Sequence, residues 1–279
     1  MTDLPRWTVS ELLARYDLEP ELADVYVEGL FDKEVITECY RAKDQSHVVY
    51  EISNVDIPHA LLAENGFTDG AKQRVIVLAR RFASLSNPVK VRCVVDRDLD
   101  HWFGELEKLS RLLWTEHCSL ELYFFSESNL QRILVTLAKV RIEDWTAFVE
   151  SLVKTLRILY AFRLADRQLG LSLSWLPQGR CLKKRGSEVS IDRDEYVDRL
   201  LDKNGRRNCR KEFLDAFETW LKKLHGDPRS YIHGHDFIEL VAWSIRNFGG
   251  LKDFTTASPL QRILILQVAY NDELYRFLG

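Results

Sequence analysis

The clearest pattern along the chain is a short apolar run at residues 91–95 that ends in carboxylates at every second position. The run is mostly β-branched, which favours a strand covered on both faces. The carboxylates are Asp96, Asp98 and Asp100. Like charges this close raise each other's pKa and cost free energy unless a cation lies among them. The pattern predicts either a polar strand-to-loop transition with a helix cap or a divalent-metal site.

Strands and helices alternate over the first half of the chain. Apolar segments at residues 23–27, 47–52, 91–95 and 119–125 predict strands. Amphipathic segments at about residues 31–40, 71–85 and 102–113 predict the helices between them. This alternation indicates βαβ units, so the expected fold class is α/β, with a mostly parallel sheet flanked by helices. In such sheets, ligands gather at the carboxyl ends of the strands.

The pattern changes after about residue 127. Helical periodicity replaces strand alternation, for example at residues 145–162 and at 237–247, where Asp236 is expected to cap the helix. We therefore expect two domains: an α/β catalytic domain over residues 1–127 and an all-helical domain over residues 128–279 that binds substrate or a partner.

The composition is that of an ordinary soluble globular protein. The chain has 279 residues, of which 46% are hydrophobic and 29% charged. No apolar run is long enough to span a bilayer, and the first residues do not resemble a signal peptide. Five scattered cysteines without a CxxC pair indicate a reducing compartment and argue against a zinc site. These features predict a cytoplasmic protein with no membrane association.

Charge is divided unevenly along the chain. Residues 1–127 contain 23 acidic and 14 basic residues, whereas residues 128–279 contain 19 acidic and 25 basic ones. The basic residues of the second half include two clusters: Arg180, Lys183, Lys184 and Arg185, and then Arg206, Arg207, Arg210 and Lys211. Such clusters are either solvated surface or a surface that binds nucleic acid or an acidic partner.

A further acidic pair follows the strand at residues 23–27. Glu28 ends that strand, and Asp32 lies four residues later, at the start of the next helix. Because the carboxyl ends of parallel strands lie at one edge, we expect this pair near Asp96 and Asp98. Carboxylate oxygens are the ligands that Mg²⁺ prefers. The four residues therefore predict a Mg²⁺ site, with Mn²⁺ as an alternative ion.

Two other metal interpretations are weaker. An EF-hand calcium loop would take its ligands from Asp96, Asp98, Asp100 and Glu107. The position that requires glycine is His101, however, and the preceding segment reads as a strand rather than a helix. His233 and His235 have no third ligand nearby in the sequence, so we interpret them as structural.

The motifs Val27-Glu28-Gly29-x-x-Asp32 and Val95-Asp96-x-Asp98 resemble the Toprim catalytic domain of topoisomerases, primases and OLD-family nucleases. The resemblance covers about residues 20–127, and the spacing from Glu28 to Asp32 is more similar to the OLD-type nucleases. Over the whole chain, the small size, Glu121 and the segment Gly234-His235-Asp236 are similar to stand-alone Toprim effectors of anti-phage systems, the group of the AriB effector of PARIS.

The resemblance implies a Mg²⁺-dependent nuclease and assigns roles to its acidic residues. The implied catalytic residues and metal ligands are Glu28, Asp96 and Asp98, with Asp32 as a second-metal or outer ligand. Asp100 and Glu121 are weaker candidates: Asp100 is expected to point away from the site, and Glu121, in the fourth strand, to hydrogen-bond a neighbour. Some Toprim nucleases place a lysine beside the metals, and Lys183 and Lys184 are candidates for it.

The resemblance also implies partners. An ABC-type ATPase would hold the protein inactive and release it on infection as a toxic effector. Its substrate would be nucleic acid, with RNA, and tRNA in particular, favoured over DNA. A homodimer is the expected active form, because a second subunit would complete a basic groove. The alternative is a catalytically inactive Toprim module that regulates the partner ATPase.

Overall fold

The computed structural model describes residues 6–86 and 89–279, which fall into two compact units. The first unit comprises Met1–Glu116 and Ile265–Gly279, and the second comprises His117–Leu264. The first is a parallel sheet flanked by helices and the second is mainly helical, which confirms the expected fold class at this level. The boundary differs from the expected division after residue 127, and the C-terminal segment returns to the first unit.

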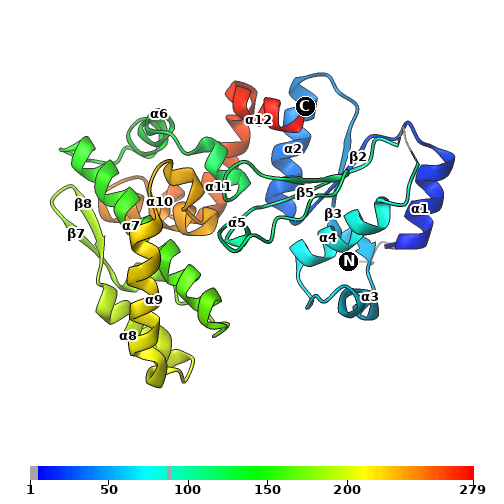
Figure 1. The fold of residues 1–279 in the computed structure, drawn as a ribbon. Helices are drawn as coiled ribbons and strands as arrows, with labels where there is room; N and C mark the ends of the chain where they lie inside the picture. The colour runs from blue at the N-terminus through cyan, green and yellow to red at the C-terminus, as the bar shows by residue number, and fades with distance from the viewer. Residues whose placement is uncertain (1–5, 87–88) are drawn as a thin grey trace. The chain divides into compact units, whose positions relative to one another are not determined.

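The sheet of the first unit has strands in the order β3-β2-β5-β6, all parallel (Figure 1). Their bounds are β2 (Asp24–Val27), β3 (Val48–Glu51), β5 (Arg92–Val95) and β6 (Leu112–Trp114). All of β2 and most of β5 is buried, as the apolar run at residues 91–95 predicts. The two strands pair in the register that sets Tyr26 opposite Cys93, so both end at the same edge.

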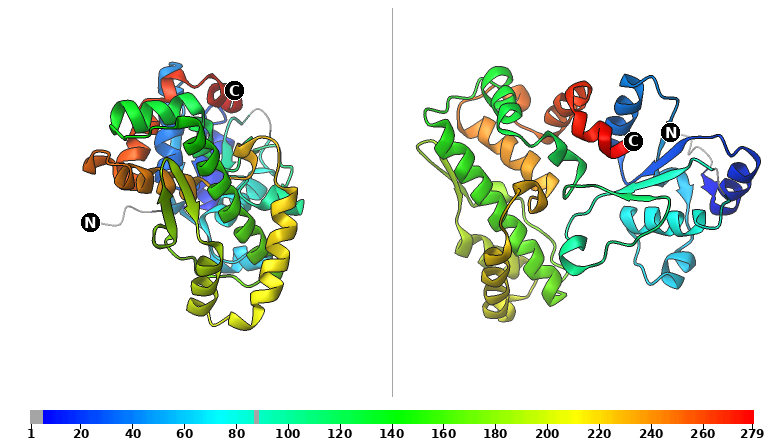
Figure 2. Two further views of the ribbon diagram at one scale, coloured as in Figure 1. Left: turned by 90° about the vertical axis from the view of Figure 1, so that its left-hand side faces the viewer. Right: turned by 45° about the horizontal axis from the view of Figure 1, so that its top comes forward.

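Helices cover both faces of this sheet (Figures 1 and 2). The helices α1 (Val9–Leu18), α3 (His59–Glu64) and α4 (Ala71–Phe82) bury apolar side chains with Tyr26, Cys93 and Val95 in one core. The helix α2 (Leu30–Ala42) lies on the other face. Two short strands, β1 (Trp7–Thr8) and β4 (Val55–Asp56), pair in parallel beside the main sheet, and η1 (Ile52–Asn54) precedes β4.

Two predicted elements of the first half are wrong. The expected helix at 102–113 is a short helix, α5 (Asp100–Phe103), that ends at Gly104 (φ +72°), and strand β6 follows it. The expected fourth strand at 119–125 is a 3₁₀ helix, η2 (Leu120–Phe124), in the second unit. Every residue of η2 is buried, and a short apolar run buried on all sides has no periodicity that separates a strand from a helix.

The second unit is built on a long helix, α7 (Trp145–Leu169). The other helices are α6 (Glu127–Gln131), which continues into the π-helix η3 (Arg132–Leu137), then α8 (Arg193–Lys203), α9 (Arg210–Lys223), α10 (Gly234–Asn247) and α11 (Ala257–Leu266), the last running into the first unit. Short 3₁₀ turns occur at η4 (Gln178–Arg180), η5 (Arg207–Cys209), η6 (Pro228–Ser230) and η7 (Lys252–Phe254). The C-terminal η8 (Val268–Tyr270) and α12 (Asp272–Leu278) belong to the first unit.

The sequence predicted an all-helical second domain, and this prediction is wrong. Its first basic cluster runs into strand β7 (Leu182–Arg185), which forms an antiparallel hairpin with β8 (Glu188–Ile191). Gly186 closes the hairpin with a φ of +59°, a conformation that glycine adopts without steric cost. The expected cap at Asp236 is also wrong, because α10 begins at Gly234 and Asp236 lies inside its first turn.

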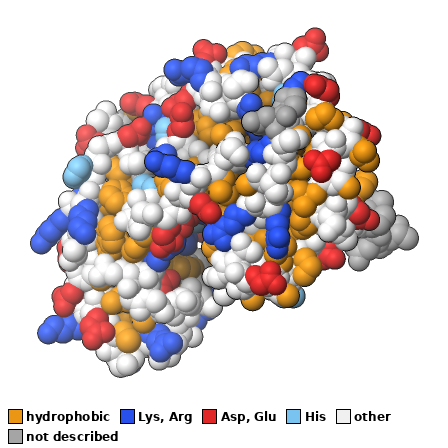
Figure 3. Space-filling model, turned by 45° about the vertical axis from the view of Figure 1, so that its right-hand side comes forward, with side chains coloured by type: hydrophobic (Ala, Val, Ile, Leu, Met, Phe, Trp, Pro, Cys, Tyr) orange, Lys and Arg blue, Asp and Glu red, His pale blue; other side chains and the backbone are white. Residues whose placement is uncertain are grey.

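Among the described residues, no helix combines the length and the apolar character needed to cross a bilayer. On the face drawn in Figure 3, acidic and basic side chains are interspersed, and neither sign of charge forms a continuous field. The uneven division of charge along the sequence therefore does not give this face a single sign.

Candidate metal centre at the carboxyl edge of the sheet

The two predicted acidic loops meet at the carboxyl edge of the sheet. Glu28 directly follows β2, and Asp96 directly follows the neighbouring strand β5. The Oε1 atom of Glu28 accepts the backbone N–H of Asp96 at 2.9 Å. This hydrogen bond joins the ends of both strands and confirms that the two motifs lie side by side.

Asp32 helps to begin helix α2. Gly29 is the N-cap of this helix, and its backbone N–H donates to Oδ2 of Asp32 at 3.1 Å. A carboxylate in the first helical turn also interacts favourably with the helix dipole. Asp32 therefore has a structural role at the start of α2, and the outer position that the sequence suggested for it stays a prediction.

The segment from Asp96 to Asp100 is a turn rather than a continuation of the strand. The backbone N–H of Asp100 donates to the carbonyl oxygen of Arg97 at 2.9 Å. Asp98 has a φ of +40°, in the left-handed region, which short polar residues such as aspartate tolerate better than most. Because the chain turns here, Asp98 and Asp100 reach the same neighbour.

That neighbour is Lys72 of α4, which was not among the predicted site residues. Its Nζ atom lies 2.5 Å from Oδ2 of Asp98 and 2.9 Å from Oδ2 of Asp100. The Lys72 side chain is only 13% exposed. The expectation that Asp100 points away from the site is therefore wrong. One signal was available: Lys72 lies in the first turn of α4, where the helix dipole disfavours a cation that has no anionic partner.

We define the acidic cluster as Glu28, Asp96, Asp98 and Asp100; Lys72 contacts two of its carboxylates. Burial raises the pKa of Glu28 to about 7; Asp98 and Asp100 act in the same direction, against Lys72 and the Asp96 amide. Burial acts to lower the pKa of Lys72, but Asp98, Asp100 and Glu28 outweigh it and raise that pKa. The charge of Lys72 therefore does not prevent burial from raising the pKa of Glu28.

The donor set fits a hard divalent cation. Carboxylate oxygens are the protein ligands of Mg²⁺, which takes only a few of them and completes its shell with water and phosphate. Within residues 6–86 and 89–279, no three Asp, Glu, His or Cys side chains already converge on one point. Lys72 instead bridges Asp98 and Asp100, so a metal held by these carboxylates would compete with its ammonium for them.

Other predicted acidic residues lie elsewhere. Glu121 belongs to the second unit and lies against Gly234, where an added Cβ would be 2.4 Å from its Oε2 atom. Glu121 is therefore not a residue of the parallel sheet. Glu107 is bound by Arg80, whose Nε donates to Oε1 at 3.0 Å, and a strand precedes Asp96, so the arrangement is not that of a calcium loop.

The two basic clusters of the second unit are partly neutralised. In the first, Lys183 pairs with Asp192 at 2.7 Å, and Lys184 donates to the Asn247 carbonyl oxygen at 3.2 Å. In the second, Arg207 pairs with Asp202 at 3.0 Å, and Arg210 bridges Asp194 and Asp198. Lys72, rather than Lys183 or Lys184, is the lysine that the structure shows in contact with the site carboxylates.

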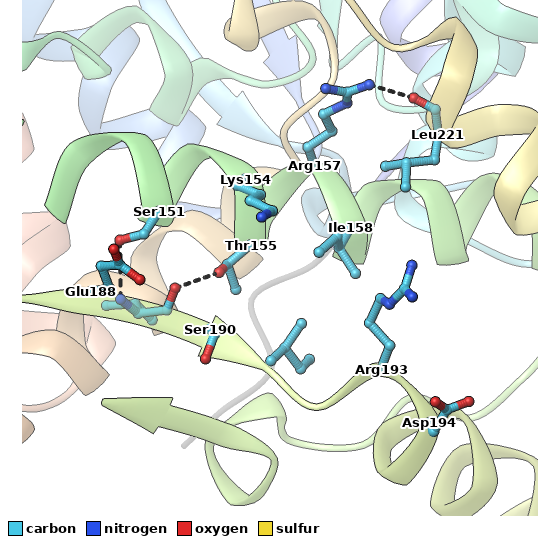
Figure 4. A pocket seen from close by; sticks show the side chains of 12 residues that line it. Ser151, Lys154, Thr155, Arg157, Ile158, Glu188, Ser190, Arg193, Asp194 and Leu221 are labelled. Atoms are coloured by element: carbon cyan, nitrogen blue, oxygen red, sulfur yellow. Dashed lines mark hydrogen bonds between the residues drawn. The ribbon is translucent and has the colours of Figure 1, made fainter. Parts of the chain in front are cut away.

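The second unit also contains a cavity of about 570 Å³ (Figure 4). Its lining includes side chains of both charges. The basic ones are Lys154, Arg157 and Arg193, and the acidic ones are Glu188 and Asp194. Arg157 is turned toward the backbone, where it donates to the Leu221 carbonyl oxygen at 2.6 Å. This mixed lining favours no particular class of ligand.

A scan against protein-family models finds no match for this chain, and a search of curated proteins finds no significantly similar sequence.

Proposed function

We propose that the chain is a Mg²⁺-dependent nuclease of the Toprim type. The observation that carries the proposal is the hydrogen bond of 2.9 Å that joins Glu28 to the Asp96 backbone at the ends of two neighbouring strands, with Asp98 and Asp100 in the turn that follows. Carboxylates this close raise each other's pKa, and a divalent cation bound among them would offset that cost. Glu28, Asp96 and Asp98 would hold the metal. Asp100 is added to this site because it shares Lys72 with Asp98.

Phosphodiester hydrolysis requires stabilisation of charge on the attacking and leaving oxygens, and a bound Mg²⁺ supplies it and lowers the pKa of its water. The protein's own contribution centres on Glu28. Because burial raises the pKa of Glu28 to about 7, both of its protonation states are populated at neutral pH. A proton acceptor with this pKa is suited to general-base catalysis, which is the alternative to Glu28 as a metal ligand, because a Mg²⁺ bound to this carboxylate would lower its pKa. Since Oε1 already accepts the Asp96 N–H, Oε2 is the atom that would carry the proton.

The resemblance to anti-phage effectors such as AriB supports a cellular role that goes with this chemistry. In that role the protein is a cytoplasmic toxin held inactive by an ABC-type ATPase and released on infection, acting as a homodimer. RNA, and tRNA in particular, is the favoured substrate. The basic clusters of the second unit are the candidates for substrate or partner contact, through residues such as Arg180, Arg185, Arg206 and Lys211, which are exposed.

The test is incubation of the purified chain with total RNA and with plasmid DNA, in Mg²⁺ and in EDTA. We expect EDTA-sensitive cleavage of RNA. The Glu28→Gln variant should lose about 100-fold or more of this activity, the loss expected when one electrostatic group of an active site is removed. Glu64→Gln, an exposed glutamate of the same unit, is the matched control and should keep full activity.

The second candidate is an inactive Toprim module that regulates an ATPase. Its supporting observation is that Lys72 already bridges two of the carboxylates, as a purely structural cluster would require. No EDTA-sensitive cleavage of either nucleic acid by the wild-type chain, together with retained ATPase binding by Glu28→Gln, would favour this function over the nuclease.

A further inference from the structure

A second cavity lies at the opposite, amino edge of the sheet. It measures about 320 Å³. Its lining residues come from the start of β5 and from the segments that precede β5, β6 and β3. Its polar lining comprises His47, Lys90, Arg92, Ser110 and Arg111, and the remaining lining is valine. The described lining residues include no aspartate or glutamate, in contrast to the mixed charge of the cavity in the second unit.

Arg111 is the unusual member of this lining. Its side chain donates from Nη2 to the carbonyl oxygens of Leu85 at 3.2 Å and Ser86 at 3.1 Å, and its Nε is buried without a hydrogen-bond acceptor. The residue is only 7% exposed. Within the described part of the chain, no carboxylate pairs with it. A buried guanidinium bonded only to neutral carbonyls is costly, and an anion in the cavity would offset that cost.

The two other cations of the lining, Arg92 and Lys90, have partners that would not prevent them from binding an anion. Arg92 donates to the Leu278 carbonyl oxygen at 2.8 Å, which is a neutral acceptor. Lys90 pairs with Glu21 at 2.6 Å, but both side chains are more than half exposed, and such surface pairs are weak. Lys90 can therefore exchange this partner for an anion at little cost.

His47 adds a group that can form one more hydrogen bond. Its ring stacks on Tyr40 with centroids 3.9 Å apart, and its Nδ1 atom is buried without a partner. Burial and the charge of Arg92 lower the pKa of His47, which keeps the ring neutral at neutral pH. A neutral imidazole can donate or accept a hydrogen bond at the cavity wall.

We propose that this amino-edge pocket binds a phosphate monoester, such as a free nucleotide or the terminal phosphate of a nucleic acid. Three permanent cations line a pocket without acids, and a monoester carries about two negative charges at neutral pH, against one for a carboxylate. Guanidinium groups match the geometry of phosphate oxygens. The volume is near the lower end of ligand pockets, which suits a phosphate group with a small part of its carrier.

The test is calorimetric titration of the full chain in EDTA, so that no nucleic acid is cleaved. The probes are inorganic phosphate, a nucleoside 5′-monophosphate, and a short RNA with and without a 5′-phosphate, with chloride at equal ionic strength as the blank. We expect saturable binding that Arg92→Gln weakens by about 10-fold, the loss of one charge-assisted hydrogen bond. Lys90→Ala should weaken binding less, and the exposed Lys252→Ala should have no effect.

Arg111→Gln is a less decisive variant, because a buried residue can affect folding, so Arg92 and Lys90 carry the test. Preference for the 5′-phosphorylated RNA would identify a nucleic-acid end as the ligand, and preference for the nucleotide would identify a free small molecule. Absence of saturable binding of every probe at millimolar concentration, or binding unchanged in Arg92→Gln, would overturn the proposal. Neither result depends on whether the carboxyl edge cleaves nucleic acid.

Discussion

The acidic cluster of the first unit and the Arg163–Asp236 pair of the second are both buried meetings of opposite charges, but their balance differs. Asp236 receives two hydrogen bonds from the Arg163 guanidinium, at 2.7 and 2.6 Å. Gln178 also donates to the Asp236 carbonyl oxygen at 3.0 Å. In the acidic cluster, by contrast, two carboxylates, those of Asp98 and Asp100, share the ammonium of Lys72, and Glu28 also lies within reach of its charge.

This difference in balance separates a structural ion pair from a candidate ligand site. Burial opposes ionisation of Asp236, yet Arg163 outweighs burial and holds the pKa of Asp236 below its ordinary value. At Glu28 burial prevails, and the pKa rises to about 7. Arg163 therefore keeps Asp236 ionised, whereas Lys72 does not outweigh burial at Glu28, the carboxylate at which an additional cation would act.

The largest expected effect is on the balanced pair. Asp236→Asn removes the carboxylate that accepts two hydrogen bonds from the Arg163 guanidinium, and removing one partner of a buried pair costs about 3 to 5 kcal/mol. Urea unfolding should show this loss in the free energy of unfolding, with no dependence on Mg²⁺. The exposed Asp253→Asn of the same unit should change stability little. A small loss at Asp236 would mean that the pair does not stabilise the fold.

The same pair gives a prediction for pH. Because the folded-state pKa of Asp236 lies below the unfolded value, its contribution is fully present above the unfolded pKa of about 3.9. That contribution should be lost as the pH falls from there through the folded pKa. The stability gap between wild type and Asp236→Asn should therefore close in acid. A gap that widened at low pH would contradict the assigned direction.

A smaller effect is expected at Lys72, where a measurement can show whether the acidic cluster differs from the Arg163–Asp236 pair. Lys72→Met removes the ammonium that contacts Asp98 and Asp100, and should cost about 2 kcal/mol in EDTA, since Asp98 is partly exposed. Unlike the loss at Asp236, part of this loss should return with Mg²⁺, because ligand binding to the folded state stabilises it. Urea titrations with and without Mg²⁺ measure both values, with the exposed Lys108→Met as control. A loss that Mg²⁺ does not change would place the cluster with the structural pairs.

The smallest effect is expected for Asp98→Asn. Removal of this carboxylate relieves repulsion among its neighbours while it weakens the contact with Lys72, so stability should change by less than about 1 kcal/mol. The pKa of Glu28 should fall, because Asp98 helps to raise it. Carboxyl NMR titration measures this pKa. An unchanged Glu28 pKa would show that the two carboxylates are not coupled.

The sequence by itself determined three of the parallel strands, β2, β3 and β5, and the two acidic motifs, but not β6. The apolar runs at β2 and β5 are buried on both faces, and parallel pairing then brings Glu28 and Asp96 to one edge whatever the rest of the chain does. The periodicity of α4 likewise predicted its helix, because one continuous face is buried against the sheet. These features depend on local pattern, which the sequence carries directly.

Only the tertiary structure decided which charges meet. Lys72 is separated in sequence from Asp98 and Asp100 by 26 and 28 residues, and it contacts them because α4 lies beside β5 and the chain turns after Asp96. In the same way, Arg111, Arg92 and His47 come from separate segments and meet at one edge of the sheet. Charge balance depends on such long-range contacts. The sequence could therefore nominate the carboxylates, but not the lysine that faces them or the basic pocket at the opposite edge.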